Sequence, residues 1–599
     1  MKSKTLCITT LTLLAALSVP LRLAAQDDQD HKHKHHHYRL IDMGTFGGPI
    51  SAINFATDIN NNAASRRGGV VGYSATSAPK LSTSQPLICG GDDGFGANIT
   101  HAFQWRIEGL IDLGALAPTD TNCSNAYQVN SHGEVAGFSE NGEFDPQIGW
   151  NQSRAVRWKD GKIEELGGFG GNQGEALAIN NRGEIVGFSL NTIPDTFSLY
   201  DSIFGSTNGT QTRAFRWHNG RMQDLGTLGG NDAGAFYIND RGQIAGFSYT
   251  SPTPDPVTGL PPLDPFLWDN GKMIDLGTLG GVLGLFTGFG GGLNNRGQVI
   301  GSSSIAADPG ACLNPETNPN CHPFLWDSGK MFDLATTTDG ASPISADGIN
   351  DKGEIAGAAD FSAAGGSTFG AYLWRNGTAF NLGTVNEDCF SRALAINNRT
   401  QIVGNSFFCN FAFDHGFLWE HGSIVDLNAL IPTGSSLTLV ATNDINDRGE
   451  IAGEGLPAGC SDGTACGHAF LLIPCDENHP GVEGCDYDTA EAPTAVTKPE
   501  TTDIGNAIRQ APRQGLRTHP HIPASSGNDS KPIGRSPVSA VDDGTADYLK
   551  DRLDGFALSG VGRARRCTPR GRQCPPQFPP CCPGLVCVPA STRAFCEPK

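Results

Sequence analysis

The chain has 599 residues, among them 78 glycines and 17 cysteines, and a formal net charge of −20 at pH 7. This length exceeds that of one ordinary domain, and the negative charge argues against non-specific nucleic-acid binding. The glycines stand at turn positions rather than in long tracts, and helical periodicity is nearly absent after the N-terminus. The composition therefore favours an all-β protein over a disordered one.

Residues 1–25 have the three parts of a signal peptide. Lys2 and Lys4 form a basic start, residues 11–19 form an apolar core, and residues 23–25 form a small-residue exit. No later apolar run in the sequence is long enough to span a bilayer. We therefore expect a secreted protein, extracellular or periplasmic, that has no membrane anchor.

Residues 26–37 are polar and rich in histidine. The histidines are His31, His33, His35, His36 and His37. Such a run can bind transition metals, but a flexible segment lacks the fixed geometry of a dedicated site. We expect a disordered, solvated segment and assign no metal site to it.

One pattern recurs from Tyr38 to about Pro474. In Arg213–Ser248 it begins with a short strand that ends in Trp217, followed by the turn Asn219-Gly220 and a strand that ends in Asp-Leu-Gly. Asn-Gly between apolar runs is a strong hairpin signal, because a type I′ turn needs positive φ at both central residues. The tryptophans of this hairpin are Trp105, Trp158, Trp217, Trp268, Trp326, Trp374 and Trp419.

A second hairpin completes each unit. It carries an asparagine at the end of its first strand and, in most units, a Gly-Glu or Gly-Gln at the start of its second. Asn favours such turns because it hydrogen-bonds its own backbone and tolerates the left-handed region. The asparagines are Asn60, Asn130, Asn180, Asn239, Asn294, Asn350, Asn397 and Asn446.

Four short strands in about 45–59 residues are typical of propeller blades, which cannot bury their apolar faces alone. The repeat array begins at Tyr38 with the Asp-Leu-Gly type of strand and ends at about Pro474 with the Trp type of strand, so its two ends are complementary halves of one unit. Pairing these halves would remove the free sheet edges. We predict an all-β fold: a closed propeller of about eight four-stranded blades, with seven as the alternative, over residues 38–485.

Long insertions follow the Gly-x-Ser strand of four units, at residues 75–100, 190–212, 249–264 and 304–321. They share one position in the repeat, so we expect them to emerge on one face of the ring. Loops gathered on one face of a rigid array are where binding usually occurs.

Sixteen cysteines follow the signal segment, which suggests disulfides in an exported protein. In the propeller the nearest partners along the chain are Cys312 with Cys321, Cys389 with Cys409, Cys460 with Cys466, and Cys475 with Cys485. Cys89 and Cys123 are the two cysteines left over, and they could form a fifth disulfide. The sequence alone does not fix these pairings.

Residues 486–566 lose the pattern and are rich in Pro, Ser, Thr, Ala and Asp, which predicts a disordered linker. Residues 567–599 form a separate module with almost no apolar content. A module that short needs cross-links to be stable. Its cysteines are Cys567, Cys574, Cys581, Cys582, Cys587 and Cys596.

Two family resemblances follow from these residues. His101-Ala102-Phe103, His468-Ala469-Phe470 and the Asp-Leu-Gly-Thr-Leu-Gly-Gly at 224–230 and 275–281 resemble the HAF family of probable extracellular repeats. That resemblance implies export and a propeller-like repeat, and supplies no catalytic residues. The spacing of the C-terminal cysteines resembles inhibitor cystine knots (knottins), which implies the pairs Cys567–Cys582, Cys574–Cys587 and Cys581–Cys596.

The repeated polar and aromatic residues have structural interpretations. The Asp-Leu-Gly aspartates could form a cation-binding ring if they faced the channel, but we expect them to bond backbone groups at a strand end. We expect the repeated tryptophans to pack between blades. Trp150 stands outside the register and is the better candidate for a surface platform. The aspartates of this slot are Asp42, Asp112, Asp224, Asp275, Asp333 and Asp426, with Glu165 and Asn381 in the other units.

No catalytic, cofactor-binding or metal-binding motif is present: the sequence contains no HExxH, no nucleophile elbow, no P-loop and no Rossmann fingerprint. Uniform repeats favour a non-catalytic binding or scaffold protein for an extracellular glycan or protein ligand. One alternative is a polysaccharide hydrolase or lyase, because propeller enzymes collect their acids and bases from several blades. Another is a carrier for a knottin-type inhibitor or toxin-like module.

Overall fold

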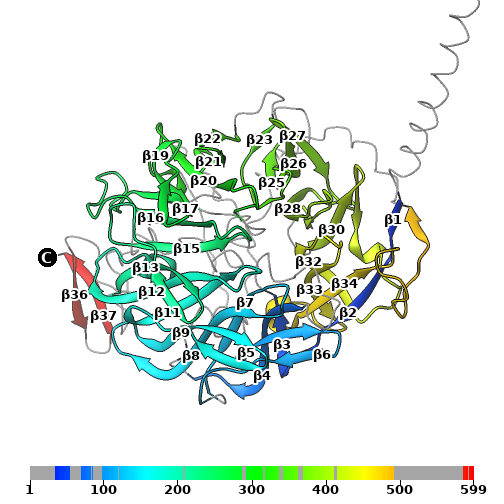
Figure 1. Ribbon diagram of the computed structural model, residues 1–599, viewed down its shortest axis with the longest axis horizontal. Coiled ribbons are helices and arrows are strands. Elements are labelled where there is room, and N and C mark those ends of the chain that lie inside the picture. Colours follow the sequence, from blue (N-terminus) through cyan, green and yellow to red (C-terminus); the bar gives the residue numbers. More distant parts are fainter. Residues whose placement is uncertain are drawn as a thin grey trace, which may run out of the picture.

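The structure is a computed structural model that describes residues 34–53, 69–81, 84, 98–118, 121–204, 206, 209–285, 292–313, 318–335, 341–361, 369–409, 414–491, 585–590 and 593–598. The described chain is all-β and propeller-like: units of four or five strands, called blades below, are arranged in a ring (Figure 1). The predicted signal peptide, most of the predicted linker, and Cys89, Cys567, Cys574, Cys581 and Cys582 lie outside the described residues.

The first four blades follow one another along the chain. Blade 1 contains β3 (Gly47–Ala52), β4 (Val70–Pro79), β5 (Asn98–Arg106) and β6 (Gly109–Asp112). Blade 2 contains β7 (Ser124–Val129), β8 (Val135–Asp145), β9 (Trp150–Lys159) and β10 (Lys162–Glu165). Blade 3 contains β11 (Gly170–Ile179), β12 (Ile185–Pro194), β13 (Thr210–His218) and β14 (Arg221–Asp224). Blade 4 contains β15 (Ala233–Ile238), β16 (Ile244–Tyr249), β17 (Leu263–Asp269) and β18 (Lys272–Asp275).

The other blades continue the series. Blade 5 contains β19 (Gly280–Leu285), β20 (Val299–Ile305), β21 (Cys321–Asp327) and β22 (Lys330–Asp333). Blade 6 contains β23 (Ser342–Pro343), β24 (Gly348–Ile349), β25 (Ile355–Asp360), β26 (Gly370–Arg375) and β27 (Thr378–Gly383). Blade 7 contains β28 (Phe390–Ile396), β29 (Ile402–Phe407), β30 (Asp414–Glu420) and β31 (Ser423–Asp426). Blade 8 contains β32 (Leu437–Ile445), β33 (Ile451–Pro457), β34 (His468–Pro474) and β2 (Tyr38–Asp42).

Blade 8 is assembled from both ends of the repeat array. β2 pairs antiparallel with β34, from Tyr38 opposite Pro474 to Asp42 opposite Phe470. This is the pairing of first and last strands that the complementary half-units predict. It satisfies the backbone groups along one side of β2 and removes a free edge from the last Trp-type strand.

The turn between the third and fourth strands has the predicted conformation. Asn219 has φ of 51° and Gly220 has φ of 76°, as a type I′ turn requires. The same pair of positive values occurs at Asp160 and Gly161 in blade 2. Both central positions of the turn need the left-handed region, which explains why Asn, Asp and Gly recur there.

A glycine in the second strand lets the inner strand bulge against it. A Cβ on Gly187 would lie 1.9 Å from the backbone oxygen of Glu175. The inner strand β11 has a register irregularity beside this point, between Ala176 and Ala178. Close approach of the two backbones therefore requires glycine here. The periodicity of the sequence does not by itself explain this glycine.

Apolar side chains from neighbouring blades form the core. Phe215 and Trp217 of blade 3 pack with Ile179 and Ile185 of the same blade and with Ala136 of blade 2. Phe215 is fully buried and Trp217 is 3% exposed. Burying a large side chain contributes roughly 1.5–3 kcal/mol, so each blade depends on its neighbour for stability.

Two segments that were expected to be disordered are partly ordered. β1 (Lys34–His36) pairs antiparallel with β35 (Thr489–Glu491), so the last residues of the histidine-rich segment and the first residues of the predicted linker form a two-stranded sheet. His35 is 1% exposed. Its Nδ1 lies 3.1 Å from Glu420 Oε1, a long-range contact that composition cannot predict.

Helices are few among the described residues. The α-helices are α3 (Leu199–Phe204) and α4 (Gly463–Cys466), and the 3-10 helices are η1 (Ala311–Leu313) and η3 (Leu427–Ala429). None of the helices in the described part of the chain is long and apolar enough to cross a membrane. The C-terminal module is described as one antiparallel hairpin, β36 (Leu585–Ala590) with β37 (Arg593–Pro598), in which Cys587 lies opposite Cys596.

Candidate functional site

The candidate site is a cavity lined by the turns between the first and second strands of blades 2–8. In blade 3 the side-chain oxygen of Asn180 accepts hydrogen bonds from the backbone N–H groups of Arg182 and Glu184, both at 3.0 Å. Gly183 follows with φ of 73°. Asparagine suits this position because its short side chain closes the turn on its own backbone.

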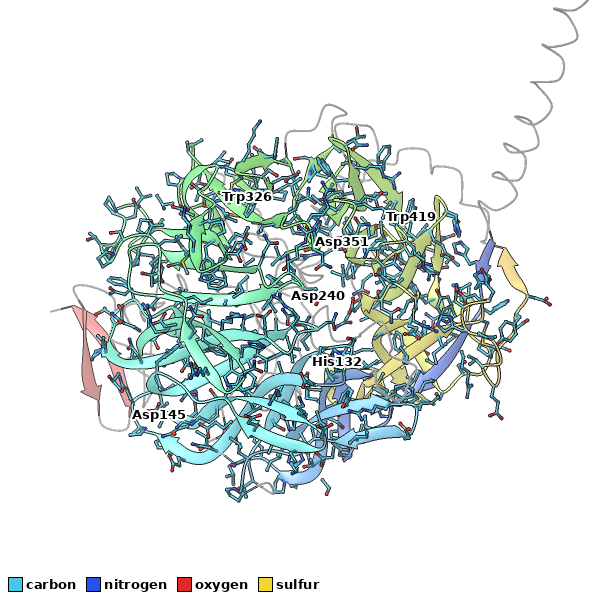
Figure 2. The ribbon with its side chains drawn as sticks, in the orientation of Figure 1. His132, Asp145, Asp240, Trp326, Asp351 and Trp419 are labelled. Atoms are coloured by element: carbon cyan, nitrogen blue, oxygen red, sulfur yellow. A yellow bond between two sulfur atoms is a disulfide. The ribbon has the colours of Figure 1, made fainter. Side chains whose placement is uncertain are left out.

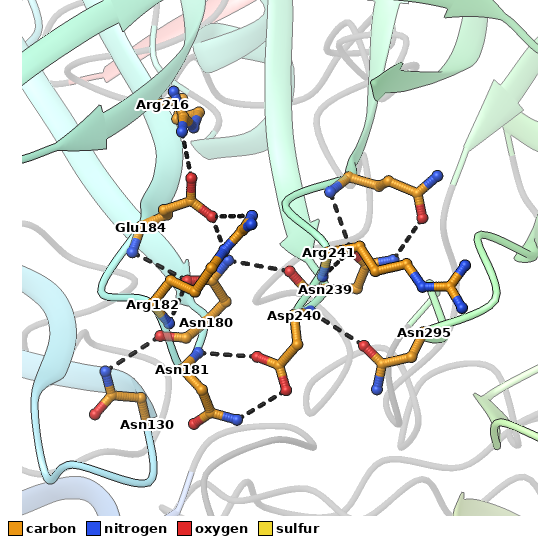
Figure 3. A network of polar contacts seen from close by, with 11 residues as sticks. Asn130, Asn180, Asn181, Arg182, Glu184, Arg216, Asn239, Asp240, Arg241 and Asn295 are labelled. Carbon is orange, nitrogen blue, oxygen red and sulfur yellow. Dashed lines mark hydrogen bonds and ion pairs between the residues drawn. The ribbon is translucent and has the colours of Figure 1, made fainter. Parts of the chain in front are cut away.

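The same asparagines also tie the blades together. Asn180 Nδ2 donates to the backbone oxygen of Asn239 in blade 4 at 3.1 Å (Figure 3). Asn239 Nδ2 in turn donates to the backbone oxygen of Asn294 at 3.0 Å. Six such bonds, between 2.8 and 3.2 Å, link Asn130, Asn180, Asn239, Asn294, Asn350, Asn397 and Asn446. We call this series the asparagine ring.

The next residue of each turn forms a second series of bonds. Asn181 N–H donates to Asp240 Oδ1 at 2.9 Å, and Asn181 Nδ2 donates to Asp240 Oδ2 at 2.8 Å. From blade 3 onward the series alternates between amide and carboxylate: Asn181, Asp240, Asn295, Asp351, Asn398 and Asp447. An amide between two carboxylates separates like charges and donates to a neighbouring carboxylate, as Asn295 Nδ2 does to Asp351 Oδ2 at 3.2 Å, which explains the alternation.

The side-chain amide of each ring asparagine also donates to a Glu or Gln that stands four residues further along the chain. Glu184 accepts from Asn180 Nδ2 and is paired with Arg216 and Arg182 (Figure 3). Burial is the largest influence on the pKa of Glu184 and raises it. The hydrogen bonds from Arg216 and Asn180 and the charge of Arg216 outweigh burial, so the pKa of Glu184 is lowered. The carboxylate therefore stays ionised and holds the turn in place.

These turns enclose a cavity of about 310 Å³. Figure 2 shows Asp240 and Asp351 in the inner part of the ring, and Trp326 and Trp419 nearer its perimeter. The asparagine-ring amides that line the cavity already bond neighbouring turns. Among the described residues no group of three or more His, Cys, Asp or Glu side chains could hold a metal ion. The lining consists of residues at the same turn positions of blades 2–8, including Asn130, Asn180, Asn239, Asn294, Asn350, Asn397 and Asn446.

The Asp-Leu-Gly aspartates do not line this cavity. They lie on the outer strands, where Gly226 N–H donates to Asp224 Oδ1 at 2.8 Å and Gly44 N–H donates to Asp42 Oδ1 at 2.9 Å. The interpretation as strand-end bonds is confirmed, and a carboxylate ring in the channel is not formed by these residues. Most of these aspartates also pair with a base on the third strand, as His101 does with Asp112 at 3.0 Å.

The repeated tryptophans pack between blades, as predicted. The Arg157 guanidinium of blade 2 lies 4.6 Å from the ring centre of Trp217 in blade 3. Trp150 does not form the predicted surface platform. Its ring is half-buried, 6.5 Å from the ring of Tyr200, and its Nε1 donates to the Tyr200 hydroxyl at 3.3 Å, because α3 of the neighbouring insertion covers it.

Two polar contacts that are not repeated around the ring are buried between neighbouring blades. Glu175 of β11 is fully buried and accepts a hydrogen bond from the Tyr127 hydroxyl at 2.9 Å. Burial raises the pKa of Glu175 to about 8. Asp347 before β24 binds Arg392 of β28 through two bonds of 2.8 Å, and both are buried. The first pair joins blades 2 and 3 and the second joins blades 6 and 7, so they do not converge on one reacting point.

Four disulfides are present among the described residues: Cys312–Cys321, Cys389–Cys409, Cys460–Cys466 and Cys475–Cys485. They are the same four pairs that proximity along the sequence suggested. Cys123 is also disulfide-bonded, and Cys89 lies outside the described residues. The four long insertions all connect the second and third strands of blades 1, 3, 4 and 5, so they share one position in the fold.

The sequence interpretation missed two parts of this site. The residue after each asparagine was not singled out, although its alternation between Asn and Asp is visible in the sequence at 181, 240, 295, 351, 398 and 447. The Glu or Gln at the fourth position was read only as the start of a strand. Its constant spacing from the asparagine was the signal that could have identified it as a bonding partner.

Comparison with known proteins adds little to this geometry. No family model and no curated protein matches the chain, so the resemblances to HAF repeats and knottins stay predictions. Among solved structures, Porphyromonas gingivalis dipeptidyl peptidase 4 is 9% identical with a TM-score of 0.35, covering 59% of this chain and 53% of the peptidase. An oligogalacturonate lyase in complex with manganese is 9% identical with a TM-score of 0.29, covering 74% and 99%.

A third solved structure is similar at the same level. Trypanosoma rangeli sialidase in complex with sialic acid is 9% identical with a TM-score of 0.26, covering 67% of this chain and 58% of the sialidase. The chain thus spans about half the length of the peptidase it matches. These likenesses are too low to carry an argument about activity, and the all-β, propeller-like class rests on the strand pairing described above.

Proposed function

We propose that this chain is a secreted, non-catalytic binding or scaffold protein for an extracellular glycan or protein ligand. Its framework is a closed eight-bladed propeller, with β2 as the outer strand of the last blade. The observation that carries the proposal is the uniform lining of the channel mouth. Each turn from blade 2 to blade 8 contributes an asparagine in the same role, whereas an enzyme needs an odd, convergent polar cluster.

The blade-specific acids support the same conclusion. Glu175 has a raised pKa, which is a feature of catalytic acids, but its side chain is fully buried behind Tyr127 and Phe188. A substrate would need access to the carboxyl group. Both carboxylate oxygens of Asp347 accept hydrogen bonds from the guanidinium group of Arg392. Both therefore act as internal ties between blades.

The ligand face that we propose is the one formed by the connections between second and third strands. These connections and the adjoining ends of the second strands carry exposed apolar side chains: Leu81 is 41%, Phe144 48%, Ile193 53% and Val257 71% exposed. The Cys312–Cys321 disulfide closes the insertion of blade 5. Exposed apolar side chains on rigid loops are typical of binding surfaces.

Export is part of the proposal. Four disulfides support it, because such bonds form and persist in oxidising compartments. The proposed secreted form begins after residue 25, carries the knottin-like module at its C-terminus, and retains Cys475–Cys485 at the end of the propeller.

Glycan and protein arrays probed with the purified secreted form test the proposal. We expect a ligand whose binding is lost in Ile193→Asp and Val257→Asp and kept in Phe332→Asp, which changes a 40% exposed side chain on the outer strand of blade 5. Absence of any binder at micromolar concentration would contradict it. Turnover of a polysaccharide panel by the same protein would favour the hydrolase or lyase instead.

A further inference from the structure

The third and fourth strands of most blades carry a base and an acid side by side. In blade 5, His322 Nδ1 lies 2.9 Å from Asp333 Oδ2, and in blade 3, Arg213 Nε lies 2.9 Å from Asp224 Oδ2. The acid is opposite the residue two positions after the base, as Asp333 is opposite Phe324. Corresponding pairs are His101–Asp112, Arg154–Glu165 and His468–Asp42.

Blade 6 has neutral residues at both positions, so neither position carries an unpaired charge. Its base position is Gly370 and its acid position is Asn381, opposite Tyr372. A Cβ on Gly370 would lie 3.2 Å from Asn381 Oδ1, so the two positions are adjacent as in the other blades. Where the base is missing, the carboxylate is missing too.

Blade 4 breaks this rule. Its base position is Asp264 and its acid position is Asp275, opposite Phe266. Gly277 N–H donates to Asp275 Oδ1 at 2.8 Å. The strand register gives Asp264 and Asp275 the same relative positions as His322 and Asp333, whose side chains lie 2.9 Å apart in blade 5. Two carboxyl groups at adjacent positions repel each other when both are ionised, so one of them favours its protonated form.

The surroundings of Asp264 give no compensating positive charge. β16 places Ser248 opposite it, and β19 pairs with its neighbour Leu263 through Leu283. Asp275, across the hairpin, is the acidic neighbour of Asp264. Burial, followed by the charge of Asp275 and the hydrogen bond to it, raises the pKa of Asp264 to about 7.

Blade 5 is a natural reference for this hairpin. Residues 264–276 read DPFLWDNGKMIDL and residues 322–334 read HPFLWDSGKMFDL. The two hairpins have the same turn geometry, with φ of 49° at Asn270 and 50° at Ser328. The exchange of Asp264 for His322 is therefore the main chemical difference at the pair.

We propose that Asp264 and Asp275 share one proton and form a pH-sensitive clasp, which holds β18 on β17 in acid and loosens it above neutral pH. The outer hairpins of blades 1, 2, 3, 5 and 8 have ion pairs at these two positions, and blade 6 has neutral residues. Blade 4 differs from them in placing two acids there. This inference goes beyond the proposed binding function and does not depend on it.

The direction follows from proton linkage. The folded-state pKa of Asp264 lies above the unfolded value of about 3.9, so the folded chain binds more protons between the two values. This group's contribution is therefore greatest below the unfolded pKa. It declines as the pH rises to about 7, and above that the two carboxylates repel each other.

Hydrogen exchange of the full secreted chain tests the clasp. The protection of residues 263–276 is expressed as a ratio to that of residues 321–334, which cancels the intrinsic pH dependence of exchange. We expect this ratio to fall about tenfold between about pH 5 and about pH 9, the factor for a change of one pKa unit of interaction. In Asp264→His, which copies blade 5, and in Asp264→Asn the ratio should stay constant.

The reverse exchange completes the experiment. His322→Asp creates two facing acids in blade 5 and should transfer the alkaline loss of protection to residues 321–334. The same pH dependence in wild type and in Asp264→Asn would overturn the proposal. So would recovery of protection at about pH 9 on addition of calcium, because the pair would then be a cation site rather than a proton clasp.

Discussion

At the scale of single residues, the asparagine of each inner turn does most to explain the architecture. Asn350 accepts from the N–H groups of Lys352 and Glu354 at 3.0 Å each, and donates to the backbone oxygen of Asn397 at 3.1 Å. One side chain thus closes its own turn and ties it to the next blade. Repetition of this role explains why the residue recurs without belonging to a specific active site.

Asn350→Ala should destabilise the protein by about 2–4 kcal/mol, because several buried backbone groups lose their partner at once and each costs roughly 1–3 kcal/mol. Denaturant unfolding followed by tryptophan fluorescence measures the loss. Gln223→Ala, on the exposed face of β14, is the control and should change stability by less than about 0.5 kcal/mol. Equal stability of both variants would show that the asparagine ring contributes nothing.

At the scale of elements, β1 and β35 show how segments outside the repeats are ordered. His35 reaches the turn between β30 and β31, where its Nδ1 lies 3.1 Å from Glu420 Oε1 and its Nε2 lies 3.3 Å from Ser423 Oγ. Burial is the largest influence on the pKa of Glu420 and raises it. Hydrogen bonds from His35 and Gln401 outweigh burial, so the pKa is lowered.

His35→Ala should lower the thermal midpoint near neutral pH and remove the hydrogen-exchange protection of residues 34–36 and 489–491. The lowered pKa of Glu420 stabilises the fold above its unfolded value of about 4.3, and this contribution is lost as the pH falls through the folded value. The difference between wild type and variant should therefore shrink below about pH 4. His132→Ala, at an exposed turn, is the control, and an equal effect of both variants would contradict the role of His35.

At the scale of the whole molecule, the two ends of the repeat array meet in blade 8. β2 supplies the strand that β34 lacks, and the backbone N–H of Cys475 donates to the oxygen of His37 at 2.8 Å. The closing strand therefore holds the first and last units together through backbone bonds and a shared core that includes Leu40 and Leu472.

Arg39→Pro should lower stability more than Lys162→Pro. The two residues occupy equivalent exposed positions on outer strands, opposite Ile473 and Lys159, and proline removes one ladder donor in each case. Only the first change affects the strand that joins the two ends of the array. Differential scanning calorimetry compares them, and equal midpoints would mean that this pairing adds no more than any outer strand.

Much of this architecture was predictable because it is local and repeated. Turn residues such as Asn219 and Gly220 specify their hairpins through their own φ preferences, and the half-units at residues 38 and 474 indicated their pairing. The tertiary structure decided what depends on contacts between distant residues. The burial of His35 on Glu420, the cover of Trp150 by Tyr200, and the meeting of Asp264 with Asp275 arise from packing and cross-strand register, which no local preference encodes.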